Sequence, residues 1–103
     1  MSADKYFAIF EETYGDDFNW MRTSSDSLVE ELKRELGDTC SFHSVTVLAK
    51  CESNDDVLFF IDGSYRIYHL TYAANIDSLR VLEFHQLSEA MDYIEKDYVE
   101  NYL

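Results

Sequence analysis

One stretch of the chain constrains the fold more than any other, because two apolar segments meet at Asp62-Gly63. The segments read VLFFI before this dipeptide and SYRIYHLTYA after it. Asp-Gly between two such runs is a strong signal for a β-hairpin with a two-residue loop. The loop predicts the cross-strand pairs Ile61–Ser64, Phe60–Tyr65 and Leu58–Ile67.

Both faces of this predicted hairpin carry bulky apolar side chains. One face would hold Leu58, Phe60, Tyr65, Ile67, His69 and Thr71, and the other Val57, Phe59, Ile61, Arg66, Tyr68, Leu70 and Tyr72. A half-exposed sheet would show one polar face instead. We therefore expect central strands with helices packed on one side. The other side needs the remaining helix, a curled sheet or another protein as cover.

The rest of the chain predicts an α+β fold in a single domain spanning residues 1–103. Apolar residues recur at helical spacing near both ends, and alternating or continuous apolar runs lie between them. We expect helices at residues 3–14, 24–37 and 88–103, and strands at residues 42–51, 57–61, 64–73 and 80–87. The element order α-α-β-β-β-β-α favours a four-stranded antiparallel meander with two N-terminal helices and one C-terminal helix.

Several side chains receive specific expectations from this pattern. Ser27 and Glu30 have the spacing of a capping box for the second helix, and Ser88 can cap the last one. Glu30 with Arg34, and Glu31 with Glu35, are expected on the solvent side of the second helix. The only tryptophan, Trp20, lies in an irregular segment and should anchor against the core.

Charge is the strongest compositional feature, with 21 acidic against 8 basic residues and a formal net charge of −13. Phosphate contacts need a basic surface, so nucleic acid is excluded as a partner, and an anionic membrane is disfavoured. The acidity favours either simple solubility or a basic partner. The N-terminal segment MSADKYFAIFEETYG is not a signal peptide, and no window approaches a transmembrane length. We expect a cytoplasmic protein in which Cys40 and Cys51 stay reduced.

No motif in the sequence carries catalytic chemistry. The cysteines and histidines lack the close paired spacing of zinc ligands, and the isolated glycines cannot form a phosphate-binding loop. We therefore expect no enzyme activity, no metal and no cofactor. His69 is favoured as a core histidine satisfied by a backbone group, with a switch or ligand contact as the alternative. A small-ligand or enzyme domain would need a pocket lined by His69 or the cysteines.

The chain is rich in tyrosine, which suits two interpretations. Tyrosine among scattered acids is typical of a recognition surface, whereas tyrosine at a core rim keeps its hydroxyl in water. Both remain open for the set Tyr14, Tyr65, Tyr68, Tyr72, Tyr93, Tyr98 and Tyr102.

The run IYHLTY, from Ile67 to Tyr72, is followed by an acidic helix and resembles a set of small bacterial proteins of mostly unassigned function. Separately, the size, acidity and α+β order are similar to the immunity proteins of bacterial toxin systems, including contact-dependent inhibition. This resemblance implies an inhibitor that binds a cognate toxin domain, often a basic nuclease, and blocks it.

For such a partner we predict contacts in two acidic loops and their aromatic neighbours: Glu11, Glu12, Tyr14, Asp16, Asp17, Trp20, Asp55 and Asp56. A solvated turn remains the alternative for each. Two other functions stay open. A homo-oligomer would bury the second sheet face in a dimer, so the protein would be a homodimer rather than a monomer. A nucleic-acid mimic would need a continuous acidic stripe, which bases such as Lys33, Arg34 and Lys96 interrupt.

Overall fold

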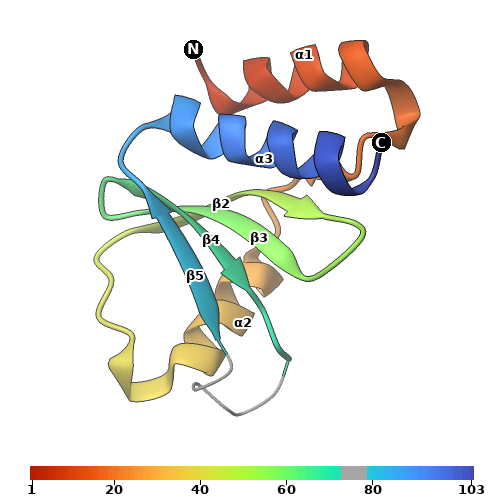
Figure 1. Cartoon of the computed structure of the whole chain (residues 1–103). Helices are drawn as coiled ribbons and strands as arrows, with labels where there is room; N and C mark the ends of the chain where they lie inside the picture. The colour runs from red at the N-terminus through yellow and green to blue at the C-terminus, as the bar shows by residue number, and fades with distance from the viewer. Residues whose placement is uncertain (73–78) are drawn as a thin grey trace.

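A computed structural model describes residues 1–72 and 79–103 of the chain. Within these residues the fold is α+β, with one antiparallel sheet in the order β1-β2-β3-β4-β5 and helices on both of its faces (Figure 1). The helices are α1 (Ala3–Tyr14), α2 (Asp26–Leu36) and α3 (Leu87–Asn101), with short 3₁₀ turns η1 (Gly15–Asp17) and η2 (Gly37–Thr39). The strands are β1 (Trp20–Arg22), β2 (Val45–Cys51), β3 (Asp56–Ile61), β4 (Ser64–His69) and β5 (Arg80–Phe84).

The prediction of four strands was wrong, because the described residues contain a fifth strand, β1. It pairs with β2 through Trp20–Cys51, Met21–Lys50 and Arg22–Ala49. Three residues are too few to show an alternating pattern, and the partner strand lies far along the chain. The predicted connection after β4 falls mostly on residues 73–78, which lie outside the described residues.

The predicted hairpin is confirmed. β3 and β4 pair in the expected register, with Ile61 opposite Ser64, Phe60 opposite Tyr65 and Leu58 opposite Ile67. Both loop residues have positive φ, 47° at Asp62 and 88° at Gly63. This is the backbone of a hairpin loop that favours Asp or Asn followed by Gly.

Asp62 also connects the hairpin loop to the segment before β2. Its carboxylate accepts hydrogen bonds from the backbone N–H of Ser44 at 2.8 Å and of His43 at 3.0 Å. Its own N–H donates to the carbonyl oxygen of Ser44 at 3.1 Å. These backbone donors, Ser44 first, lower the pKa of Asp62 because they favour its charged form.

Replacing Asp62 by Asn should lower the urea midpoint of unfolding near neutral pH, because a neutral amide is a weaker acceptor for these two donors. The folded pKa of Asp62 lies below its unfolded value, so its stabilisation is present above the unfolded pKa and is lost as pH falls. The difference between wild type and Asp62→Asn should therefore be full above about pH 5 and shrink below about pH 4. Asp38→Asn, an exposed site with the same charge change, is the control. A midpoint difference that does not depend on pH would contradict this account.

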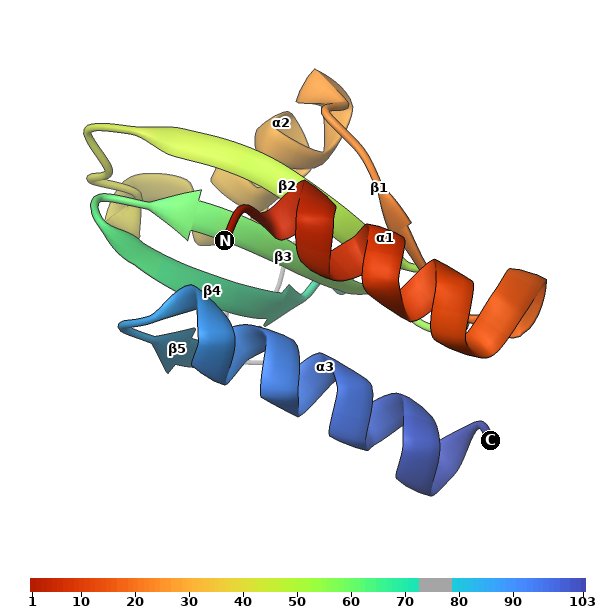
Figure 2. The same cartoon turned by 90° about the horizontal axis from the view of Figure 1, so that it is seen from above.

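Helices cover both faces of the central hairpin, whereas the sequence predicted helices on one face and left the cover of the other face open. α1 and α3 lie on one face, where they bury Leu58 and Ile67 (Figure 2). α2 lies on the other face, where Leu32 packs with Val57 and Phe59. The second cover is therefore the protein's own second helix.

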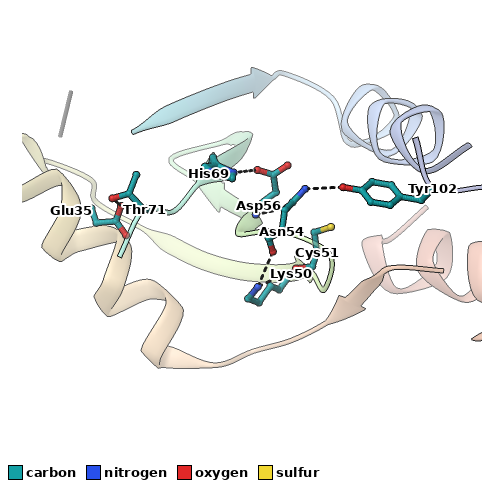
Figure 3. Close-up of polar contacts among 8 residues, drawn as sticks. All are labelled: Glu35, Lys50, Cys51, Asn54, Asp56, His69, Thr71 and Tyr102. Carbon is teal, nitrogen blue, oxygen red and sulfur yellow. Dashed lines mark hydrogen bonds and ion pairs between the residues drawn. The ribbon is translucent and has the colours of Figure 1, made fainter. Parts of the chain in front are cut away.

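Glu35 corrects the prediction for the solvent side of α2. Its side chain is buried, with the residue only 4% exposed. It accepts hydrogen bonds from the N–H and the hydroxyl of Thr71, both at 2.7 Å (Figure 3). It also accepts a hydrogen bond from the N–H of Tyr72 at 3.2 Å. Tyr72 has a φ of 56°, a strained conformation for a tyrosine, so Glu35 holds the turn that ends β4. The predicted partner of Arg34 was also wrong, since Arg34 bonds Glu31 rather than Glu30.

Removing the Glu35 carboxylate should destabilise the fold, because the donors at Thr71 and Tyr72 would lose this acceptor. We expect Glu35→Ala to lower the free energy of unfolding by about 2–3 kcal/mol, measured by urea titration. Glu30→Ala, at an exposed position of the same helix, is the matched control and should stay within about 0.5 kcal/mol of wild type. Equal losses in the two variants would show that the buried contacts of Glu35 contribute nothing.

Both predicted helix caps were wrong by a short shift along the chain. α2 has Ser25 as its N-cap, so Ser27 already lies inside the helix. α3 has Gln86 as its N-cap, in a capping box with Glu89, so Ser88 is helical too. Both starts offer more than one capping residue within two positions, so the sequence pattern leaves the first helical residue open by that much.

Two further features concern thiols and membranes. Cys40 and Cys51 are free, as predicted. Cys51 is fully buried, and this burial raises the pKa of its thiol. In the part of the chain that the structure describes, no helix has the length and apolar character needed to cross a membrane.

Candidate partner-binding surface

α1 and α3 run side by side in the same direction and end at the same end of the molecule (Figures 1 and 2). The hydroxyl of Tyr14 donates a 2.7 Å hydrogen bond to Glu95 Oε2, and this bond raises the pKa of Tyr14. The ring of Tyr14 also packs against Tyr98, with 5.1 Å between ring centroids. These contacts fix the C-terminal end of α1 against α3.

The turn between β2 and β3 reaches the same end. The N–H of Glu52 donates to the carbonyl oxygen of Asn19 at 2.6 Å, and the side-chain amide of Asn19 donates to Ser53 Oγ at 3.1 Å. The side-chain amide of Asn54 donates to the hydroxyl of Tyr102, just beyond α3, at 3.4 Å (Figure 3). Three segments that are distant in sequence therefore meet here.

Exposed carboxylates lie on each of these three segments, and we call this set of residues the acidic end. Its members are Glu12, Asp16, Asp17, Glu52 and Glu100. Among the described residues, one ion pair involves this set: Lys96 lies 3.9 Å from Glu100 in a solvent-exposed pair. Such exposed pairs contribute little. The Nζ atom of Lys50 lies at the same turn as Glu52 and donates to the carbonyl oxygens of Cys51 and Asn54. Five carboxylates against these two lysines still leave the acidic end with a net negative charge.

The helix ends strengthen this negative charge. An α-helix carries a partial negative charge at its C-terminus, where basic side chains are normally favoured. Neither α1 nor α3 has a basic residue in its last turn. Glu12 and Glu100 instead place a like charge there, which costs about 0.3–1 kcal/mol each.

Of the predicted contact residues, those of the first acidic loop divide into two groups. Glu12, Asp16 and Asp17 are exposed on the acidic end. Glu11 pairs with Arg22 at 2.9 Å, and Tyr14 bonds to α3 as described. Trp20 is 3% exposed and anchors against the core, as predicted for its ring, so it cannot reach a partner in this conformation.

The predicted residues of the second loop, Asp55 and Asp56, are not brought to the acidic end. Asp56 bonds the Nδ1 atom of His69 at 2.8 Å (Figure 3). Asp55 lies near Tyr72, whose pKa is raised by burial and then by the negative charge of Asp55. Asp56 is the first residue of β3 and Asp55 lies in the turn before it, and the two carboxylates have different neighbours.

Sequence reasoning missed Glu52 and Glu100 as members of this surface. Glu52 was visible only as the first residue of a polar turn, and its place beside η1 depends on the pairing of β1 with β2. Glu100 was visible only as a polar position on a helix. Neither position carries a local signal, because the contact is made by distant segments.

The structure decides between the alternatives for His69 and for several of the tyrosines. The imidazole of His69 is 40% exposed and bonds a carboxylate, so the expectation of a core histidine satisfied by backbone was wrong. Tyr68 and Tyr98 are buried, whereas Tyr72 and Tyr102 are 50% and 44% exposed. Within residues 1–72 and 79–103, no group of three or more His, Cys, Asp or Glu side chains is arranged to hold a metal ion.

Comparison with known proteins found no matching family model, no similar curated protein and no similar solved structure.

The bond between Asn19 and Ser53 should couple the two loops energetically. We expect Asn19→Ala and Ser53→Ala each to lower the free energy of unfolding by about 1 kcal/mol. The double variant should lose less than the sum of the two, with a coupling energy of about 0.5–1 kcal/mol, because both changes remove the same bond. Strict additivity in urea titrations would mean that this bond does not join the loops.

Proposed function

We propose that this chain is a cytoplasmic immunity protein that binds a basic toxin domain, a nuclease, and blocks its active site. The observation that carries the proposal is the acidic end. Two parallel helices terminate there with carboxylates in place of the basic residues that their dipoles favour. An arrangement that costs stability is readily explained when a cationic partner compensates it.

The chemistry of such a partner follows from the charge. A nuclease active site presents Lys and Arg side chains to phosphates, and exposed carboxylates can occupy the same positions. Opposite potentials accelerate encounter and give salt-sensitive association. The formal net charge of −13 extends this attraction beyond the contact surface.

The alternative hypothesis, a homo-oligomer, assumed that the second face of the sheet is left uncovered by the chain itself. α2 occupies that face and buries Val57, Phe59 and Ile61 against Leu32. A second copy is therefore not needed to cover the central strands, and we favour the toxin-binding proposal.

The proposal is tested by immobilising the protein and capturing binding partners from a lysate of its native host at low salt. The eluate should contain nuclease activity, measured as degradation of RNA and DNA, and added wild-type protein should suppress it. The triple variant Asp16→Asn, Asp17→Asn, Glu52→Gln should need at least about tenfold more protein for the same suppression.

The matched control neutralises three exposed carboxylates elsewhere: Glu30→Gln, Asp38→Asn and Asp92→Asn. This triple variant changes the net charge equally and should inhibit like wild type. Absence of any inhibited nuclease would refute the toxin-binding proposal. Equal weakening by both triple variants would refute the role of the acidic end.

A further inference from the structure

A pocket of about 570 Å³ opens between α3 and the strands β3, β4 and β5. It shares no residue with the acidic end. Its size falls within the range of small-molecule sites. His69 lines this pocket, and a pocket lined by His69 is the feature that a small-ligand domain was expected to need.

The strand register places three charged or titratable side chains in one row of this pocket. Asp56 lies opposite His69, and His69 lies opposite Arg80. Directly opposed residues of antiparallel strands share a face, with their Cβ atoms about 4.5–5.5 Å apart. The next row on the same face contains Ile67 opposite Leu82. The pocket therefore has a polar row and an apolar row side by side.

Within the polar row, Asp56 and His69 are hydrogen-bonded to each other. A carboxylate only accepts hydrogen bonds, so the Nδ1 atom of His69 carries the proton of their 2.8 Å contact (Figure 3). The Nε2 atom of His69 is left for other contacts. Arg80 differs from Arg22 and Arg66, which pair with carboxylates. In the described part of the chain Arg80 has no ion pair.

The remaining wall of the pocket favours a partly apolar ligand. Leu82 is 43% exposed on the edge strand β5, and Ile67 lies opposite it on β4. Tyr93 of α3 also lines the pocket. Burial first, and then the charges of Asp97 and Asp56, raise the pKa of Tyr93, so its phenol remains a neutral hydrogen-bond donor.

We propose that this pocket binds a small monocarboxylate with an apolar body. Arg80 pairs with the carboxylate in a charge-assisted contact, and the apolar body lies on Ile67 and Leu82. A single negative charge fits better than a phosphate, because the net charge of the protein repels multiply charged anions. This proposal does not depend on the toxin-binding function.

The test titrates ¹⁵N-labelled protein with hexanoate and follows backbone amide shifts by NMR. Saturable changes are expected at His69, Arg80 and Leu82. Hexanamide, which has the same shape without the charge, should bind at least about tenfold more weakly. Arg80→Gln should weaken hexanoate binding by a similar factor. Leu82→Asn should also weaken it, since it removes apolar contact while retaining the charge.

The control is Lys33→Gln, which removes one positive charge from α2 on the opposite face of the sheet. It should keep hexanoate affinity within about twofold of wild type. Circular dichroism confirms that each variant is folded. The proposal is overturned if hexanoate causes no saturable change at the pocket, if hexanamide binds equally well, or if Arg80→Gln and Lys33→Gln have the same effect.

Discussion

Burial of β3 on both faces is the constraint on which the rest of the structure depends. Val57 and Leu58 are neighbours that point to opposite sides of the sheet, and both are fully buried. Removing such side chains from water stabilises the fold by about 1.5–3 kcal/mol each, so both faces must be covered. The helices before and after the strands have to supply that cover, and this decides where every other surface lies.

The acidic end follows from the way one face is closed. α1 and α3 come from opposite ends of the chain, yet they pack on the same face and run in the same direction. Their negative helix ends therefore coincide. The chain places Glu12 and Glu100 there, although a lysine at either position would stabilise the helix. The negative charge at this surface therefore lowers the stability of the two helices, and proteins often accept such a loss where they bind a partner.

Much of the fold could be read from the chain because its signals are local. The register of the hairpin follows from Asp62-Gly63, since a two-residue loop leaves one way to pair the strands. The helices follow from apolar spacing. β1 could not be read, because three residues have no measurable period. Glu35 was misassigned because its partners, Thr71 and Tyr72, are reached only after the chain has crossed the sheet. Three of the five residues of the acidic end, those in α1 and η1, were predicted, whereas Glu52 and Glu100 were not.

The sequence by itself determined the α+β class, the central hairpin, the two free thiols and the excess of acidic residues. These properties depend on the spacing of apolar residues, on the residues of the turn and on composition, all of which can be read from residues close together in the chain. Only the tertiary structure decided which segments meet at the acidic end, that Asp55 and Asp56 have different neighbours, and that Asp56, His69 and Arg80 form one row. The physical reason is that these relations are distances between segments far apart in the chain. They exist only once burial of β3 has brought those segments together.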